Sequence, residues 1–436
     1  MKTLHYRLSL SFAGAALLFS AVGHAQPVAT PAAMPPPAAA AVPFVLPASD
    51  DGLPGTGPIR RYDWFQKLWT EKRSGWAKRV KQDQDGLVFL GDSITQGWAA
   101  NLTQLFPGIK TVNRGISGDT TRGVLLRLEQ DVIALKPRGI VLLIGTNDLE
   151  EGAAPESTAG NLKLILAALR AHNPAMPVVL CAVLPSSTTK KRPAEQIKKI
   201  NQQCFALLKD EPQVTWVDTW TLFANAQGDA KAGEFPDLLH PNAEGYIKLS
   251  AALRPVLETV GLAPAWPDDF APEPGFERLF NGRDLTGWGY ADKPAFDGKT
   301  VSDDGRFAAR NGRLVVTVAR EERAYRKLMT TRKFPGDFVL KLEFRASPNA
   351  DSGVFVREPQ LQMRDFHLAG PWLTLKHYRP LEWNEVVVTV KGGLAHATCN
   401  GEVLVDAFPV PASGPIGVES DKGQIEYRRI RVQETR

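Results

Sequence analysis

The stretch GLVFLGDSITQG, residues 86–97, decides the fold class of the first half of this chain. Its apolar run Leu87–Leu90 is typical of a short strand buried on both faces, and Gly91-Asp92-Ser93 then leads into a helix. Similar apolar runs, separated by helical periods, occur at Ile140–Ile144, Val178–Leu184 and Val214–Val217. Buried strands that alternate with amphipathic helices predict a parallel sheet covered on both faces, with a site beyond the carboxyl ends of its strands.

The pattern changes after the Pro-rich stretch Pro264–Pro274. From Phe338 to Phe344 every second residue is apolar, which is the period of a strand with one buried face. Asn311-Gly312 and Asn400-Gly401 are typical of tight hairpin turns. The second half is therefore predicted to be an all-β sandwich.

The N-terminus is predicted to be a secretory signal peptide. Lys2 and Arg7 precede an apolar run, Leu8–Val22, and small residues follow it. We expect a periplasmic or secreted protein; the alternative is an uncleaved membrane anchor. Residues 26–58 are rich in Pro and Ala and predict an extended tether.

Charge and cysteine content exclude several classes of protein. The formal charge of the 436-residue chain is +5, and cleavage of the signal peptide lowers it further. No basic run is interleaved with aromatic residues, so we expect no nucleic-acid binding. Three cysteines cannot form a disulfide framework, and none stands in a metal-ligand pair. Cys181 and Cys204 fit small core positions.

Four short motifs carry the candidate chemistry. Ser93 follows the first strand, and a serine there on its own is ordinarily a helix cap. Asp237 and His240 stand three residues apart before the last helix of the first half, where the carboxylate can orient an imidazole that accepts a serine proton. Gly118 and Asn147 follow two further strands and can donate hydrogen bonds to a developing oxyanion.

The blocks GDSITQGW, NRGISGDTT, GTND and DLLHP resemble those of the SGNH/GDSL hydrolases, and most closely the platelet-activating-factor-acetylhydrolase-like branch. The resemblance implies a flavodoxin-like three-layer α/β/α sandwich and ester hydrolysis without a metal or cofactor. It also implies that Ser93 is the nucleophile, His240 the base and Asp237 the acid of a triad. The implied oxyanion hole consists of the Ser93 and Gly118 amides and the Asn147 side chain. Self-association is a further possibility in this branch.

The second half resembles the 3-keto-disaccharide hydrolase domain, a concanavalin-like β-sandwich, through segments such as GFERLFNGRDLTGW and ADSGVFVR. Glu343, Arg345 and Gln362 are the weak candidates for substrate binding, and a solvated outer face is an equal alternative for Glu343 and Arg345. The family usually has a Glu-x-Gln step where this chain has Gln360-Leu361-Gln362, so one candidate acid is an amide. We therefore favour a carbohydrate-binding module over a retained enzyme.

The combined prediction is an exported serine esterase acting on acetyl or short acyl esters of a small molecule or glycan. The alternatives are a lipid-directed esterase and a carbohydrate-binding or glycoside-cleaving protein with an inert esterase half. No membrane span is expected after signal cleavage. Two side predictions concern the first domain: Trp64, Trp69 and Trp76 cover the sheet, and the loop Ser186–Arg192 is a solvated basic loop rather than a border of the substrate cleft. The predicted divisions are a signal peptide at 1–25, a tether at 26–58, an esterase domain at 59–263, a linker at 264–274 and a β-sandwich at 275–436.

Overall fold

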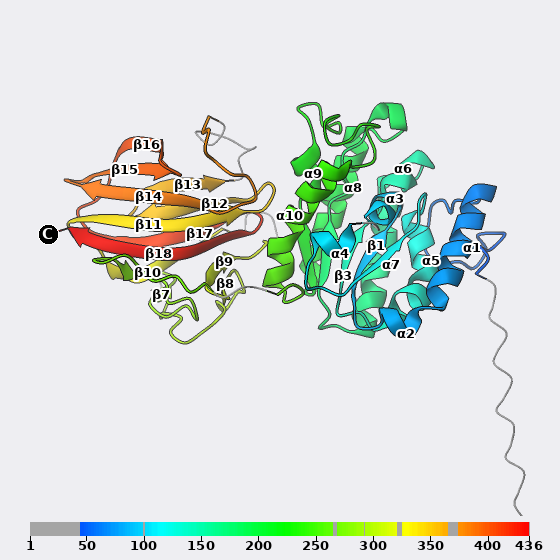
Figure 1. Ribbon diagram of the computed structural model, residues 1–436, viewed down its shortest axis with the longest axis horizontal. Helices are drawn as coiled ribbons and strands as arrows, with labels where there is room; N and C mark the ends of the chain where they lie inside the picture. Colours follow the sequence, from blue (N-terminus) through cyan, green and yellow to red (C-terminus); the bar gives the residue numbers. More distant parts are fainter. Residues whose placement is uncertain are drawn as a thin grey trace, which may run out of the picture. The chain divides into compact units, whose positions relative to one another are not determined.

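The computed structural model describes residues 44–98, 101–264, 268–291, 293–320, 325–364 and 374–435 (Figure 1). The predicted signal peptide and residues 26–43 of the predicted tether lie outside these ranges, as do residues 265–267 of the predicted linker and residues 365–373 of the predicted β-sandwich. Among the described residues, no helix has both the length and the apolar character needed to cross a membrane.

The first half is built on a parallel five-stranded sheet. Its strands are β1 (Leu87–Gly91), β2 (Thr111–Gly115), β3 (Gly139–Leu143), β4 (Val178–Cys181) and β5 (Val214–Val217). Their spatial order is β2-β1-β3-β4-β5, and all four pairings are parallel. This is the flavodoxin-like order, in which a topological switch lies beside β1. The prediction of the fold class is confirmed.

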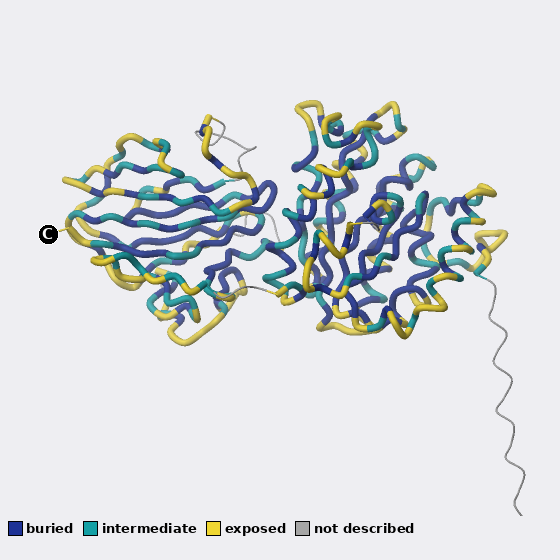
Figure 2. The backbone as a smooth tube through the Cα atoms, viewed as in Figure 1, coloured by how far each residue is buried: buried dark blue, intermediate teal, exposed yellow. Residues whose placement is uncertain are grey.

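Helices cover both faces of this sheet. They are α1 (Asp63–Ala77), α2 (Val80–Asp83), α3 (Ser93–Gly97), α4 (Leu102–Leu105), α5 (Thr121–Asp131), α6 (Thr146–Glu150), α7 (Pro155–His172), α8 (Ala194–Ala206), α9 (Thr219–Phe223) and α10 (Ala243–Thr259), with 3-10 turns at Ile133–Leu135, Thr188–Lys190 and Leu207–Asp210. Successive side chains of β1 enter different cores: Val88 and Leu90 pack with α5, α7 and α8, whereas Leu87 and Phe89 pack with α3, α4 and α10. Because both faces of β1 and β3 are buried, these two strands are nearly continuous apolar runs (Figure 2).

The packed chain begins earlier than the predicted tether boundary. Leu46 is buried with Ile59, Phe65 and Trp69 of the α1 region. The Asp50 carboxylate also binds Arg122 of α5. Residues 44–58 are therefore held against the first domain, because their few apolar and acidic side chains find partners there.

The second half is a sandwich of two antiparallel sheets, as predicted. Its strands are β6 (Glu277–Arg278), β7 (Trp288–Gly289), β8 (Phe307–Arg310), β9 (Arg313–Val316), β10 (Arg326–Lys333), β11 (Asp337–Ala346), β12 (Asp351–Val356), β13 (Gln360–Arg364), β14 (Asn384–Lys391), β15 (Leu394–Cys399), β16 (Glu402–Pro409), β17 (Pro415–Ser420) and β18 (Ile425–Thr435). One sheet runs β13-β12-β17-β10-β7 and the other β16-β15-β14-β11-β18-β9-β8. Buried and half-buried residues alternate strictly along β11, so its apolar residues enter one core.

The predicted hairpin turns are present. Asn311 and Gly312 join β8 to β9 with φ of 50° and 78°, and Asn400 and Gly401 join β15 to β16 with φ of 48° and 83°. Two successive positive φ values are characteristic of the type I′ turn, which Asn-Gly accommodates at low cost.

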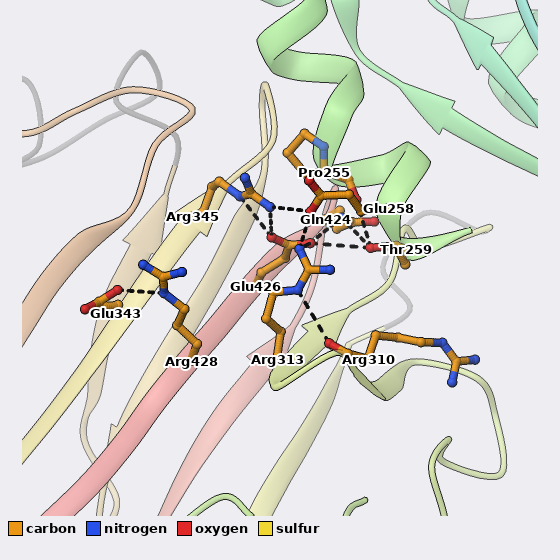
Figure 3. Close-up of polar contacts among 10 residues, drawn as sticks. All are labelled: Pro255, Glu258, Thr259, Arg310, Arg313, Glu343, Arg345, Gln424, Glu426 and Arg428. Carbon is orange, nitrogen blue, oxygen red and sulfur yellow. Dashed lines mark hydrogen bonds and ion pairs between the residues drawn. The ribbon is translucent and has the colours of Figure 1, made fainter. Parts of the chain in front are cut away.

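The end of α10 contacts the sandwich through charged side chains (Figure 3). Glu258 pairs with Arg313 and with Arg345, whose guanidinium also binds Glu426 at 2.6 Å. The Glu426 side chain is 1% exposed. Thr259 accepts a hydrogen bond from Gln424 at 3.1 Å. The two carboxylates and two guanidinium groups of this network balance one another and are shielded from water. Removing one of them would leave a buried charge without its partner, which is strongly destabilising.

Candidate active site

The motifs of the first domain meet at the carboxyl edge of the parallel sheet. Ser93 begins α3 directly after β1, and Asn147 lies in α6 after β3. Gly118 lies in the turn after β2. Because β1 lies between β2 and β3, the three turns are neighbours although they are distant in sequence. His240 comes from the loop before α10.

The turn that carries Ser93 is tightly constrained. A Cβ atom at Gly91 would lie 2.1 Å from the Leu143 carbonyl oxygen of β3, so only glycine fits there. The Asp92 carboxylate caps α3 by accepting a hydrogen bond from the Ile94 amide at 2.9 Å. Tyr246 of α10 donates its hydroxyl to the Ile94 carbonyl at 2.8 Å. These contacts fix the backbone on both sides of Ser93.

A chain of short hydrogen bonds joins Ser93, His240 and Asp237. The His240 Nε2 atom lies 2.9 Å from Ser93 Oγ, and Nδ1 lies 2.7 Å from Asp237 Oδ2. Asp237 Oδ1 accepts the amides of Leu239 and His240, at 3.0 and 2.7 Å, which folds the loop around the carboxylate. Leu238 has a φ of 61°, so this loop is held in a conformation that most residues avoid.

The surroundings keep Asp237 ionised. Partial burial tends to raise the pKa of its carboxyl, but the hydrogen bonds from the His240 amide and ring and from the Leu239 amide outweigh burial and lower the pKa to about 2. An anionic Asp237 beside Nδ1 favours the tautomer with the proton on Nδ1, which leaves Nε2 able to accept the Ser93 proton.

Two of the three candidate oxyanion donors, Gly118 and Asn147, meet at the turn after β2. Asn147 is 3% exposed, and its Nδ2 donates to the Asp119 carbonyl at 3.0 Å, next to Gly118. An amide nitrogen carries two hydrogens, so this bond leaves a second one to donate. Gly118 has a φ of 87°, and a Cβ there would lie 2.6 Å from Trp64. Glycine is therefore required by both the backbone and the packing.

The aspartates near the site have structural partners. Asp119 pairs with Arg127 at 2.8 Å, with both side chains fully buried, and Asp148 accepts the Thr121 amide at 3.0 Å. Burial raises the pKa of both carboxyls to about 6. Burial raises the pKa of Asp92 to about 7, although the bond from the Ile94 amide opposes this.

Two predictions about the surroundings are wrong. The loop Ser186–Arg192 is not simply solvated: Ser186 donates to the Leu238 carbonyl at 2.8 Å, and Arg192 is 1% exposed beneath Asn147. Trp69 is buried as predicted, whereas Trp64 is 51% exposed beside Gly118. The sequence pattern gave no signal for either contact, because both partners are distant in the chain.

The weak candidates of the sandwich are held in other contacts. Glu343 pairs with Arg428 at 2.7 Å, and Arg345 pairs with Glu426 and Glu258. Gln362 donates to the Ser352 carbonyl at 3.0 Å. Ion pairs at Glu343 and Arg345 thus replace the solvated outer face that was one of the two alternatives for these residues, and none of the three joins the Ser93 site.

The three cysteines are not reactive thiols, and the described residues hold no arranged set of metal ligands. Cys181, Cys204 and Cys399 are buried, and burial raises the pKa of each thiol to about 12. Over the residues described above, no group of three His, Cys, Asp or Glu side chains is arranged to hold a metal ion.

Comparisons with known proteins agree with the family resemblance of each half of the chain. Residues 89–247 match the model of the GDSL-like lipase/acylhydrolase family, and residues 275–433 match the 3-keto-alpha-glucoside-1,2-lyase-like domain. Human platelet-activating factor acetylhydrolase IB subunit alpha2 is 28% identical over 192 residues, 43% of this chain and 83% of that protein. The bovine alpha1 subunit is 27% identical over 192 residues, 43% of this chain and 82% of that protein.

A solved GDSL-like lipase from Bacteroides thetaiotaomicron is 27% identical, with a TM-score of 0.39, and the match covers 44% of this chain and 97% of that one. Three findings are mutually consistent: the matches to the two family models, the parallel sheet, and the order of the motifs along the chain. The chain is a carboxylic ester hydrolase, whose residues 89–247 match the GDSL-like lipase/acylhydrolase family and whose residues 275–433 match the 3-keto-alpha-glucoside-1,2-lyase-like domain.

Proposed function

We propose that this protein is an exported serine esterase that hydrolyses acetyl or other short acyl esters on carbohydrate. The observation that carries the serine mechanism is the hydrogen-bonded chain Ser93–His240–Asp237, with distances of 2.9 and 2.7 Å. Such an arrangement activates a hydroxyl that is otherwise a weak nucleophile.

In the proposed reaction Ser93 Oγ attacks the ester carbonyl while His240 Nε2 takes its proton. The oxyanion that forms accepts hydrogen bonds from the Ser93 and Gly118 amides and from Asn147 Nδ2. The tetrahedral intermediate then expels the alcohol, which receives the proton from His240 and leaves an acyl-enzyme. Water, deprotonated by His240, attacks the acyl-enzyme and releases the acid, which restores Ser93.

The carbohydrate part of the proposal has a separate basis. It is supported by the second domain, whose family is named for a glucoside. This support comes from the presence of the two domains in one chain, by analogy, and not from the chemistry of the residues at the Ser93 site. Export is supported by the N-terminal residues 1–25, and self-association stays a prediction.

The test is hydrolysis of p-nitrophenyl acetate by the chain from Gln26, compared with Ser93→Ala. We expect turnover by the parent chain and its loss in the variant, with unchanged far-UV circular dichroism and melting temperature. Equal turnover by both proteins would contradict the serine mechanism. Absence of turnover in both, on acetate through octanoate esters, would favour the binding protein with an inert esterase half.

A lipid-directed esterase is the second candidate, because the curated relatives described above are platelet-activating factor acetylhydrolase subunits. The two candidates are separated by comparing acetate release from an acetylated methyl glycoside with acetate release from a 2-acetyl phospholipid. A higher kcat/KM for the phospholipid would replace carbohydrate by lipid in the proposal.

A further inference from the structure

Two exposed aromatic rings lie beside the Gly118 turn of the Ser93 site. Tyr62 is 54% exposed and Trp64 is 51% exposed, and their ring planes are 16° apart with centroids separated by 6.4 Å. Large aromatic side chains usually contribute to a core, so a stacked pair in contact with solvent calls for an explanation. The reaction mechanism assigns neither ring a role.

The position of Trp64 connects this pair to the reacting groups. A Cβ atom added to Gly118 would lie 2.6 Å from Trp64 Cη2 and 3.2 Å from Phe65 Cδ2. Trp64 therefore touches the turn whose Asp119 carbonyl holds Asn147 Nδ2. A ligand whose carbonyl sits at this turn has Trp64 as its neighbour.

The rings are held in place from one side. The Arg60 guanidinium carbon lies 5.8 Å from the Tyr62 ring centroid and 5.7 Å from that of Trp64. Arg60 is 6% exposed, and its Nε donates to Glu151 at 2.7 Å. A buried guanidinium packs against the pair from within, so the exposed parts of the rings are available to a ligand at little cost in side-chain entropy.

The chemistry of this surface favours a sugar over an acyl chain. An acyl chain gains most from an enclosed apolar groove, whereas these rings remain half open to water. A pyranose has a flat face of C–H groups that can cover an aromatic ring while its hydroxyl groups stay hydrated. Glu151, next to Arg60 and 15% exposed in its side chain, adds a carboxylate that can accept bonds from such hydroxyls.

We propose that Trp64 and Tyr62 form a stacking platform for the sugar ring that carries the ester, on the alcohol side of the scissile bond. The assignment rests on the proposed function, and it specifies where the carbohydrate binds: in the esterase domain itself, in addition to any site on the β-sandwich. The platform makes Trp64 a specificity-determining residue, while the bond-breaking groups remain Ser93 and His240.

The activity test compares two acetate esters that differ in the alcohol, ethyl acetate and a mono-O-acetylated methyl glucopyranoside, by the rate of acetate release. In Trp64→Ala the ratio of kcat/KM for the sugar ester to that for ethyl acetate should fall about tenfold, mainly through KM. Trp64→Phe, which keeps a ring, should recover most of this ratio. The matched control is Leu164→Ala, an exposed apolar residue of α7 (44% exposed), which should keep the parent ratio.

Two results would overturn the platform. An equal loss on both esters in Trp64→Ala would mean that Trp64 only supports the Gly118 turn. A changed preference between ethyl acetate and ethyl butanoate, with the sugar ratio intact, would place the acyl group on the rings.

A binding experiment separates this proposal from the proposed function. Calorimetric titration of Ser93→Ala with xylotriose should give binding that the double variant Ser93→Ala/Trp64→Ala weakens about tenfold. That result would support the platform even if Ser93 proved not to be the nucleophile. Equal affinity and equal stoichiometry of the two variants for xylotriose would refute the platform while leaving the serine mechanism intact.

Discussion

Arg192 Nη2 donates to Asn147 Oδ1 at 2.8 Å, and this contact determines which way the Asn147 amide faces. With Oδ1 bound to a guanidinium, Nδ2 is turned toward the Asp119 carbonyl and the Gly118 turn. Arg192 is itself anchored by the Thr146 carbonyl at 3.0 Å and by Glu150 at 2.8 Å. A residue from the loop between β4 and α8 thus positions a side chain of α6.

Arg192→Met should therefore lower kcat for p-nitrophenyl acetate by about tenfold, less than the 10²–10³-fold expected for Asn147→Ala. If Arg192 acts through Asn147, its replacement should cost little more in the Asn147→Ala background, so the two losses should not add. Steady-state kinetics of the four proteins check this. Arg73→Met is the control, because Arg73 is also buried in an ion pair, at 2.8 Å from Asp131, but that partner lies in α5 and not among the residues of the Ser93 site. Additive losses would contradict the positioning role.

Asp237→Asn should lower kcat by up to about 10⁴-fold with little change in KM. The amide cannot supply the negative charge that orients His240 and stabilises its cation, although it can keep hydrogen bonds to the loop. Kinetics on p-nitrophenyl acetate measure the effect. Glu244→Gln removes an exposed carboxylate at the start of α10 and should leave kcat unchanged. A loss of less than tenfold in Asp237→Asn would argue against the triad.

Asp92 should make the protein less stable as the pH rises from 5 to 8. The pKa of Asp92 in the folded state is about 7, above its ordinary value of 3.8. Between pH 3.8 and pH 7 the folded state therefore binds more protons than the unfolded state, and the free energy of unfolding falls as the pH increases. The Asp92 Oδ2 atom is buried, and it finds no hydrogen-bond partner among the described residues.

Asp92→Asn keeps an oxygen to cap α3 but cannot ionise. Between pH 5 and pH 8 the parent protein should lose about 2–3 kcal/mol more stability than this variant. Urea unfolding at the two pH values measures the difference. Identical pH dependence in the two proteins would show that Asp92 is ionised throughout this range.

Glu258→Ala should lower the free energy of unfolding by about 3–5 kcal/mol, because it leaves Arg313 and Arg345 with Glu426 as their remaining carboxylate in this network. Esterase kcat should be unchanged, since Glu258 lies at the far end of α10 from the His240 loop. Chemical unfolding and p-nitrophenyl acetate kinetics test the two statements. Glu195→Ala, which breaks a surface pair with Lys198, should cost less than about 1 kcal/mol. A comparable cost for both variants would show that the α10 contact contributes no more than a surface ion pair.

Much of the architecture could be predicted because it depends on local patterns. Runs such as Leu87–Leu90 are buried on both faces, so their composition reveals a parallel sheet without any knowledge of its neighbours. Strict alternation along Phe338–Phe344 likewise reveals a sheet with one face in a core. The tether boundary was less predictable, because packing of Leu46 depends on a pocket made by the α1 region.

The sequence by itself determined the two fold classes, the order of the motifs and the candidate roles of Ser93, Asp237 and His240. These follow from hydrophobic period and from the residue types at a strand end and in the loop before the last helix of the first half. Tertiary structure alone decided which side chains surround them. It placed Arg192 on Asn147, Trp64 on Gly118, and Arg345 on Glu258 rather than in solvent. Each of these contacts joins residues at least 45 positions apart in the chain. Periodicity reports whether a residue is buried, but the partner it meets is set by how distant elements pack.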